Sequence, residues 1–171
     1  DERVGGLPLD PAAFPDAASL QSNFNIGRIQ VSAIDGDDDG DGDYDRLQSY
    51  GARSFSIFDR MGNLVFDSGS QIEAIVATYG RDNADDGRSD NKGPEPEGVE
   101  TGKIETTSYA FVGLERTSQI LVYDVSTPWS PVFVQLLANE GDVSPEGLEF
   151  ISAKDSPNNC PSLLVTNEVS N

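Results

Sequence analysis

The sequence predicts an all-β protein, and three of its features support this prediction. It holds 17 Gly and 10 Pro in 171 residues, which is typical of a fold with many turns. From residue 27 onward, short segments with alternating apolar and polar residues follow one another, and such alternation indicates strands. The segment Pro96-Glu-Gly-Val-Glu100 recurs as Pro145-Glu-Gly-Leu-Glu149, which indicates that a structural unit is repeated.

The spacing of this repeat predicts a β-propeller. A period of about 40 to 50 residues with four strands in each unit is typical of propeller blades. We therefore predict a β-propeller fragment of about two and a half four-stranded blades. Because closure takes about four to eight blades, we expect the remaining propeller blades to come from the same precursor or from another chain. A β-sandwich or a β-solenoid with two similar hairpins is the alternative.

Residues 1–26 are expected to form an N-terminal segment with a short helix, begun by Asp10 or Asp16 as its N-cap. The first predicted blade covers residues 27–75 and carries an Asp-rich calcium loop. Met61-Gly62-Asn63 is expected to form its hairpin turn. The four strands of this blade are predicted at 27–35, 45–51, 54–59 and 63–69.

The rest of the chain is divided into three parts. Residues 76–96 form a polar loop between blades, residues 97–140 form the second blade, and residues 141–171 begin a third blade that is incomplete. The strands of the second blade are predicted at 97–104, 108–115, 119–125 and 131–138. Those of the third are predicted at 146–153 and 161–169.

Charge and composition exclude several classes of function. The formal net charge of −19 makes nucleic acid and anionic membrane surfaces poor partners, because the chain repels phosphates. The absence of His and the presence of one Cys, Cys160, exclude the usual zinc sites and any Ser-His-Asp or Cys-His catalytic arrangement within the chain. We expect Cys160 to be an unreactive thiol in a loop.

The expected location is extracellular or periplasmic. No apolar run reaches the roughly 18 to 20 residues of a membrane span, and the first ten residues do not form a signal peptide. Because the sequence does not begin with Met, we expect a processed product. Little Cys, a high acidic content and Asp-rich loops suit compartments in which calcium is abundant.

Residues 35–45 carry the clearest candidate metal site. Oxygen ligands at alternate positions with interleaved glycines suit a loop wrapped around Ca²⁺. Because Gln48 stands where an EF-hand has its bidentate Glu, we predict a calcium loop between strands that is not an EF-hand. The alternative is a solvated acidic turn. The predicted calcium ligands of this loop are Asp37, Asp39, Asp41, Asp43 and Asp45.

Four glutamates repeat with the predicted blades. Glu97 and Glu146 open the first strands of successive units, and Glu115 and Glu168 close the second strands. The first strands of propeller blades line the central channel, so these carboxylates are expected to converge and to bind a metal or perform acid–base chemistry. The alternative is a repeated turn or a hydrogen bond to a neighbouring amide.

Arg53 and Arg116 are the candidate catalytic residues, because they occupy comparable places in the two units. An arginine at such a place can hold an anionic group of a substrate. The alternative is that each arginine pairs with those four repeated glutamates.

Four long runs of the sequence resemble the choice-of-anchor I proteins, a family that includes mesenchyme-specific cell surface glycoproteins. The runs are residues 36–59, 89–100, 109–128 and 144–171. The resemblance implies a secreted or surface-attached β-propeller, and some bacterial members carry an alkaline phosphatase or phytase-like label. The chain stops where the family pattern continues, and it lacks the earlier blades, so an activity of the whole family can depend on residues that are absent here.

Three functions remain open from the sequence. The first is a secreted, calcium-binding β-propeller that acts as an extracellular or cell-surface binding module, with a surface ligand as partner. The second is a calcium-dependent phosphoesterase, with a phosphoester as substrate, in which the repeated glutamates hold calcium and Arg53 or Arg116 steadies the charge of the phosphoryl group. The third is an accessory chain of a different protein.

Overall fold

The structure is a computed structural model that describes residues 2–50, 53–79 and 93–170. Residues 2–50 belong to one compact unit, which we call the N-terminal unit. Residues 53–79 and 94–170 belong to a second, the C-terminal unit. Each unit is described by itself.

The N-terminal unit contains little regular structure. Strand β1 (Glu2–Arg3) pairs antiparallel with β2 (Gln30–Val31), a 3-10 helix (Val4–Gly6) follows β1, and α1 spans Ala17–Leu20. The short helix expected in this segment is thus present, with Asp16 at its N-cap. Four buried apolar side chains hold the unit together, and these are Val4, Leu7, Leu9 and Val31.

The structure differs from the four-stranded unit expected over residues 27–75. Within 27–50 only β2 forms a strand, and residues 45–50 contribute a single bridge between Val31 and Ser49. The reason lies in residues 35–45, where aspartates and glycines leave no alternating apolar residues and the aspartate side chains bond backbone N–H groups of their own loop. The strands near residues 56–67 belong to the C-terminal unit.

A helix that the sequence reading did not anticipate, α2 (Gln71–Tyr79), follows these strands. Its apolar residues Ile72, Ile75, Val76 and Tyr79 are spaced three or four apart, which is the helical period and not the strand period. Ile72 and Val76 are buried. The expectation that only strands follow residue 26 is therefore wrong for this segment.

The C-terminal unit is built from antiparallel strands. The hairpin of β3 (Ser56–Phe58) and β4 (Leu64–Asp67) turns at the expected residues, where the Gly62 N–H donates to the Asp59 carbonyl. A four-stranded sheet follows in the order β5-β6-β7-β8. Its strands are β5 (Pro96–Ile104), β6 (Thr107–Leu114), β7 (Gln119–Asp124) and β8 (Val132–Leu137). A last hairpin consists of β9 (Pro145–Ile151) and β10 (Ser162–Asn167), and its loop carries Cys160, which is exposed.

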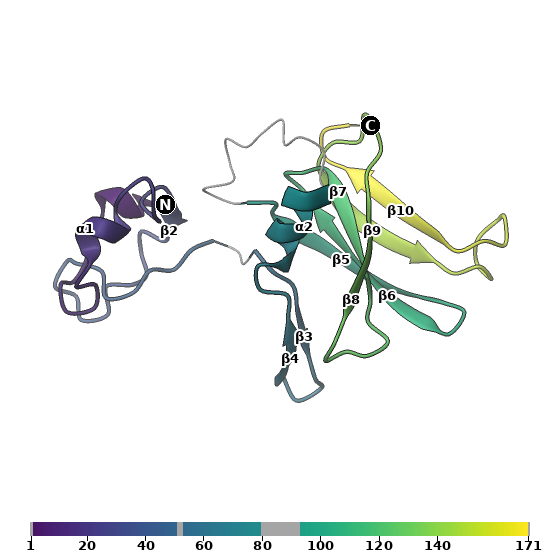
Figure 1. The fold of residues 1–171 in the computed structure, drawn as a ribbon, viewed down its shortest axis with the longest axis horizontal. Helices are drawn as coiled ribbons and strands as arrows, with labels where there is room; N and C mark the ends of the chain where they lie inside the picture. The colour runs from purple at the N-terminus through teal and green to yellow at the C-terminus, as the bar shows by residue number, and fades with distance from the viewer. Residues whose placement is uncertain (1, 51–52, 80–92, 171) are drawn as a thin grey trace. The chain divides into compact units, whose positions relative to one another are not determined.

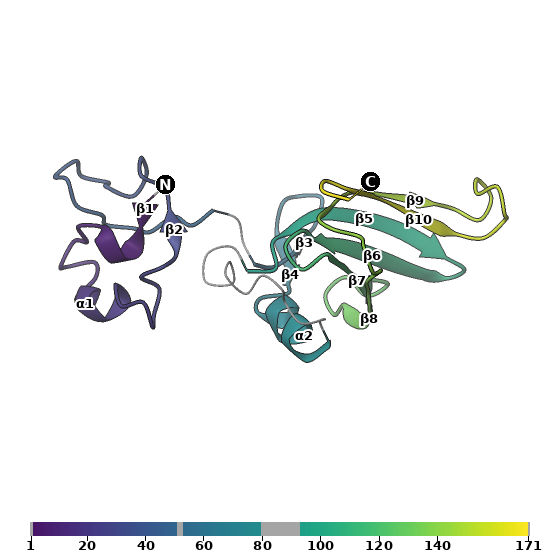
Figure 2. The same ribbon diagram turned by 90° about the horizontal axis from the view of Figure 1, so that it is seen from above.

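The four-stranded sheet is covered on both faces within the C-terminal unit. Helix α2 lies on one face and the β9–β10 hairpin on the other (Figure 2). On the first face Ile72 and Val76 pack with buried residues of β6 and β7, among them Tyr123. On the second face Phe111 packs against Phe150 of β9, with ring centroids 5.8 Å apart. The all-β prediction is confirmed, since most regular structure lies in antiparallel strands, while the number of blades stays a prediction.

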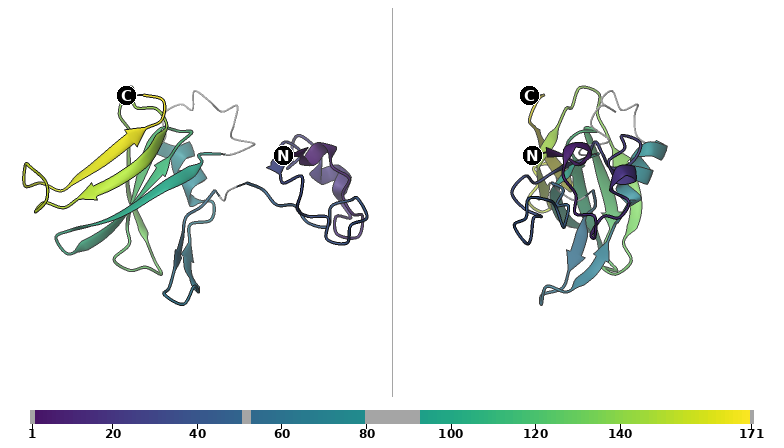
Figure 3. Two further views of the ribbon diagram at one scale, coloured as in Figure 1. Left: turned by 180° about the vertical axis from the view of Figure 1, so that it is seen from behind. Right: turned by 90° about the vertical axis from the view of Figure 1, so that its left-hand side faces the viewer.

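The β5–β6 and β9–β10 hairpins are two copies of one structure and lie alongside each other (Figure 3, left). The two hairpins have the same register. Pro145 of β9 corresponds to Pro96 of β5, and Asn167 of β10 corresponds to Leu114 of β6. Each hairpin also has a register shift at the end that holds the proline. The matched pairs are Val99 with Val112, Glu100 with Phe111 and Thr101 with Ala110 in the first hairpin, and Leu148 with Val165, Glu149 with Leu164 and Phe150 with Leu163 in the second.

The entry to each hairpin repeats as well. Glu95 and Ser144, the residues before the two prolines, have φ values of 56° and 60°, a left-handed conformation that is uncommon outside glycine. The Glu115 N–H donates to the Glu95 carbonyl at 3.0 Å, and the Glu168 N–H donates to the Ser144 carbonyl at 2.8 Å. The sequence repeat is therefore a repeat of backbone conformation and hydrogen bonding.

Candidate functional site

The Asp-rich segment, residues 35–45, forms a closed loop in the N-terminal unit, and we call it the aspartate loop. The N–H groups of Asp45 and Arg46 both donate to the Gly36 carbonyl, at 2.7 and 3.0 Å. Gly36 has a φ of 116°, and a Cβ at this position would overlap the Arg46 carbonyl. Closure of the loop therefore depends on glycine at position 36.

Aspartate side chains shape the loop from within. The Asp37 carboxylate accepts hydrogen bonds from the N–H groups of Gly40 and Gly42, at 2.7 and 3.1 Å. The Asp45 carboxylate accepts one from the Asp38 N–H at 2.8 Å. These three hydrogen bonds hold the backbone of residues 38, 40 and 42 close to the carboxylates of Asp37 and Asp45.

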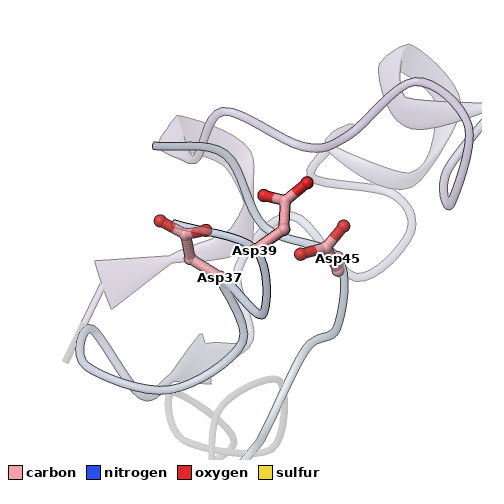
Figure 4. A group of neighbouring side chains, drawn as sticks. All are labelled: Asp37, Asp39 and Asp45. Atoms are coloured by element: carbon pink, nitrogen blue, oxygen red, sulfur yellow. The ribbon is translucent and has the colours of Figure 1, made fainter. Parts of the chain in front are cut away.

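The loop brings together Asp37, Asp39 and Asp45 (Figure 4). One carboxylate oxygen of each lies within 4.8 Å of the corresponding oxygens of the other two. The other two predicted ligands, Asp41 and Asp43, lie outside this group of three. The Asp41 carboxylate instead accepts a hydrogen bond from the Asp43 N–H at 3.1 Å.

Repulsion between carboxylates is visible in the pKa values of the loop. For Asp39, a hydrogen bond from the Asp41 N–H lowers the pKa, but the charges of Asp41, Asp45 and Asp37 together with burial raise it, so that the net shift is upward. Burial and the charges of Asp41 and Asp10 raise the pKa of Asp43. The loop thus carries more negative charge than its own hydrogen-bond donors neutralise.

The basic residue that directly follows the aspartate loop, Arg46, pairs with Asp38. Arg46 donates two hydrogen bonds to Asp38, each 2.6 Å long. This contact lowers the pKa of Asp38. The ion pair of Arg46 is therefore with Asp38, which lies outside the group of Asp37, Asp39 and Asp45.

The donor set of the aspartate loop fits calcium. Ca²⁺ binds oxygen ligands at about 2.3–2.6 Å, so two oxygens on one ion lie at most about 5 Å apart. The separation of no more than 4.8 Å between oxygens of Asp37, Asp39 and Asp45 meets this limit. Each carboxylate oxygen that accepts one N–H hydrogen bond keeps a further lone pair for a metal.

A second group of carboxylates lies in the C-terminal unit, at the end of the β5–β6 hairpin. Oxygens of Glu95, Glu97 and Glu115 lie within 4.8 Å of one another. Glu95 and Glu115 are only 8% and 6% exposed. Glu97 and Glu115 were predicted from the sequence, whereas Glu95 was missed, although its place directly before the repeated Pro96 was a usable signal.

Arg116 pairs with two members of this second group. Its Nε donates to Glu95 Oε2 at 2.5 Å, and its Nη1 lies 3.0 Å from Glu115 Oε1. Burial alone would lower the pKa of Arg116, but the bond to Glu95 and the surrounding negative charges raise it. We call Glu95, Glu97, Glu115 and Arg116 the glutamate cluster.

Carboxylates of both hairpins act on Glu115. Burial raises the pKa of Glu115 most, Arg116 lowers it, and the charges of Glu95, Glu97 and Glu168 raise it further. Glu168, which directly follows β10, lies outside the group of three carboxylates, so the convergence of the repeated glutamates stays a prediction. Glu146 lies outside the group of three, and its backbone carbonyl is what neighbours β5, next to Gly98.

The two candidate arginines have different partners. Arg53 pairs with Glu73 of α2, with Nη1 and Oε1 2.5 Å apart. Arg116 pairs with Glu95 and Glu115. Arg116 thus pairs with one of the repeated glutamates, Glu115, whereas the partner of Arg53, Glu73, is not among them, and the two arginines do not share one partner.

Comparisons with known proteins complete this description. The family model of the choice-of-anchor I domain matches residues 1–128. The chain is also similar to Gigasin-3a of Magallana gigas, with 29% identity over 182 residues that cover 86% of this chain. The chain spans 63% of the length of this curated relative. No solved structure matches the chain. In the described residues, no helix has the length and apolar character needed to cross a membrane.

Proposed function

The chain belongs to the choice-of-anchor I domain family, and from this premise we propose that it is an extracellular, surface-associated binding module that holds Ca²⁺ in its aspartate loop. The family description supports association with a surface, and the net charge of −19 suits a calcium-rich exterior. The proposal concerns binding and includes no chemical step.

The carrying observation is the convergence of Asp37, Asp39 and Asp45 to within 4.8 Å. In the N-terminal unit, which has a small apolar core, a cation bound by this group would connect residues at both ends of the aspartate loop. Calcium supplies a compact double positive charge there and relieves the repulsion that raises the pKa of Asp39. The carboxylates of Asp41 and Asp43 and backbone carbonyls of the loop are the further oxygens available to complete its shell.

Calorimetric titration of the chain with Ca²⁺ tests the proposal. We expect binding that the double substitution of Asp37→Asn and Asp45→Asn weakens by at least about tenfold, because two charged ligands become neutral. Asp16→Asn removes one negative charge at an exposed position of the same unit and serves as the control. Equal loss of affinity in both variants would show that calcium binds diffusely and would refute a specific loop site.

Sensitised terbium luminescence gives a second, local measurement. Tyr44 lies inside the aspartate loop, and excitation of a nearby tyrosine makes a bound lanthanide emit. We expect Tb³⁺ emission that Ca²⁺ displaces in the parent chain and that the Asp37→Asn, Asp45→Asn variant lacks. Emission that persists in that variant would place the ion elsewhere.

A calcium-dependent phosphoesterase is the second candidate, and the convergence of Glu95, Glu97 and Glu115 is the observation in its favour. It is supported less well, because Arg116 already pairs with two of these carboxylates and Arg53 pairs with Glu73 of α2. Assay of p-nitrophenyl phosphate hydrolysis across alkaline pH, with and without a chelator, separates the two candidates. Absence of calcium-dependent turnover excludes the enzyme and leaves the binding module.

A further inference from the structure

The aspartate loop contains three Asp–Gly dipeptides, which are Asp35-Gly36, Asp39-Gly40 and Asp41-Gly42. An aspartate that precedes glycine can form a cyclic imide, because glycine has no Cβ to keep its backbone nitrogen away from the carboxyl carbon of the preceding side chain. The attack requires that this nitrogen and this carbon lie close together. The direction of each aspartate side chain therefore decides which of the three dipeptides reacts.

The side chains of Asp39 and Asp41 are folded forward along the chain. Asp39 Oδ1 accepts a hydrogen bond from the Asp41 N–H at 3.2 Å, and Asp41 Oδ1 accepts one from the Asp43 N–H at 3.1 Å. A hydrogen bond from the N–H two residues later closes a ring that contains both the carboxyl carbon of the aspartate and the nitrogen of the next residue. Each of these carboxyl carbons is thus held beside the peptide bond to the following glycine.

The Asp35 side chain is directed the opposite way. Asp35 Oδ2 accepts a hydrogen bond from Ser32 Oγ at 2.7 Å, and Ser32 is buried. The carboxyl group of Asp35 is therefore held toward a residue that precedes it, and not toward the Gly36 nitrogen. Gly36 is also fixed, because its carbonyl accepts the hydrogen bonds from Asp45 and Arg46 that close the loop.

One carboxylate accepts the protons of both attacking nitrogens. The Gly40 N–H donates to Asp37 Oδ1 at 2.7 Å, and the Gly42 N–H donates to Asp37 Oδ2 at 3.1 Å. A carboxylate within hydrogen-bond distance of an N–H is positioned to take up its proton when the nitrogen forms a new bond. Asp37 therefore serves the two dipeptides whose aspartate side chains are folded forward.

We propose that Asp39 and Asp41 are sites of spontaneous backbone modification, at which the loop converts aspartate into isoaspartate, while Asp35 in the same loop stays unmodified. In the first step the Gly40 nitrogen bonds to Asp39 Cγ, the N–H proton passes to Asp37, and one Cγ–O bond of Asp39 breaks. The oxygen leaves as water, which carries this proton and one proton from solvent. Water then opens the imide at the backbone carbonyl of residue 39, which releases a proton and routes the main chain through Cβ and Cγ. Asp41 reacts in the same way with the glycine that follows it.

Peptide mapping of the full chain tests the proposal. The chain is incubated at neutral pH with a chelator, and electron-transfer fragmentation then distinguishes isoaspartate from aspartate at each position. We expect at least about fivefold more isoaspartate at Asp39 and at Asp41 than at Asp35, because only the first two carboxyl carbons are held beside the attacking nitrogen. The inference goes beyond calcium binding, and because the chelator keeps metal ions off the loop, the result does not depend on whether the loop binds calcium.

A synthetic peptide of residues 33–47 is the control for the fold. It holds the same three dipeptides without the hydrogen bonds that direct their side chains in the folded chain. We expect the peptide to lose the selectivity against Asp35. Equal amounts of isoaspartate at the three positions of the folded chain, or the same distribution in the chain and in the peptide, overturns the proposal.

Substitution of each glycine separates the two positions. Gly40→Ala adds a Cβ beside one attacking nitrogen, and we expect isoaspartate at Asp39 to fall at least about fivefold while Asp41 is unaffected. Gly42→Ala is the matched variant, with the opposite expectation. A Cβ at either position meets no atom within 4 Å, so neither variant forces the loop apart by a clash. Loss of isoaspartate at both positions in either variant would contradict attack by the individual glycine nitrogens.

Removal of the proton acceptor tests the role of Asp37. Asp37→Asn keeps the size of the side chain but removes the carboxylate, and we expect it to slow isoaspartate formation at both Asp39 and Asp41 by at least about tenfold. Asp16→Asn, at an exposed position of the same unit, is the control and leaves both rates unchanged. Rates in the Asp37→Asn variant that equal or exceed those of the control would contradict the assignment of Asp37 as the proton acceptor.

Discussion

The aspartate loop and the glutamate cluster each hold three carboxylates within 4.8 Å, yet they balance this charge differently. In the glutamate cluster two of the carboxylates are buried, and Arg116 lies between them. In the aspartate loop the carboxylates of Asp37 and Asp39 are exposed and accept hydrogen bonds from backbone N–H groups. The glutamate cluster thus includes a cation of its own chain, whereas the aspartate loop has room for a cation from solution.

The comparison of the aspartate loop with the glutamate cluster shows that proximity of carboxylates alone does not identify a metal site. Arg116 pairs with both Glu95 and Glu115, so the glutamate cluster works as a structural ion-pair network at the end of the β5–β6 hairpin. The aspartate loop lacks such a side chain at its group of three among the described residues. Four predictions test this contrast, from the largest expected effect to the smallest.

Removal of calcium is expected to affect only one of the two units. A ligand at 100 times its Kd stabilises the folded state by about 2.7 kcal/mol, and chelation removes this contribution. We expect faster amide exchange and a lower melting temperature for residues 2–50, with the C-terminal unit unchanged. A chelator that leaves the melt of the N-terminal unit unaltered, or that shifts both units equally, would end the contrast.

Gly36→Ala is expected to open the aspartate loop. The left-handed φ of 116° and the overlap with the Arg46 carbonyl should together lower the stability of the loop by about 2 kcal/mol and reduce calcium affinity. Gly40→Ala is the matched control, because Gly40 also has a positive φ but no neighbour within 4 Å of an added Cβ. Urea unfolding and calorimetry measure both effects, and a smaller loss for Gly36→Ala than for Gly40→Ala contradicts the argument.

Arg116→Met is expected to destabilise the C-terminal unit. Breaking a buried ion pair costs about 3 to 5 kcal/mol, and because 28% of the Arg116 side chain is exposed we expect about 2 kcal/mol. Arg46→Met breaks the exposed pair with Asp38 and should have no measurable effect on stability. Urea unfolding followed by circular dichroism compares them, and equal effects would mean that Arg116 is not the internal cation.

Glu115→Gln gives the smallest effect, and its sign depends on pH. Since the pKa of Glu115 is raised above its ordinary value of 4.5, the folded state favours the protonated form, and ionisation lowers stability as pH rises through the folded pKa. The substitution should therefore stabilise the chain at pH 7, by less than about 1 kcal/mol. This gain disappears below pH 4.5, where the carboxyl is protonated in both states. A gain that is the same at pH 4 and pH 7 would contradict the assigned titration.

The sequence predicted the C-terminal unit better than the N-terminal unit, for a physical reason. Strands β5 to β10 bury one or both faces, so their apolar residues alternate or form short continuous runs, as in β7, and their bounds follow from the pattern. The expected strands at 119–125 and 131–138 lie within a residue of β7 and β8. Residues 27–50 fold around hydrogen bonds of aspartate side chains, which leave no apolar period to recognise. Helix α2 was missed although its apolar residues follow the helical period, because residues 71–79 were divided between the first blade, which ended at 75, and the polar loop 76–96.

Candidate site residues were predicted unevenly, because spacing in sequence does not determine which side chains meet. The aspartates were found as a group, but the loop conformation selects Asp37, Asp39 and Asp45 from the five. For the glutamates, the repeat identified Glu97 and Glu115. Glu95 joins the cluster from a left-handed backbone conformation, and the only sequence signal for this conformation is the proline that follows. The counter-ion Arg116 was named, and its partners followed only from the structure.

The exposed Cys160 has a practical consequence. It is the single thiol of the sequence and lies in the loop of the second hairpin, between β9 and β10. A maleimide-linked fluorophore or spin label therefore attaches at one defined point, without any substitution to remove competing sulfhydryls. The label reports motion of that hairpin tip in solution.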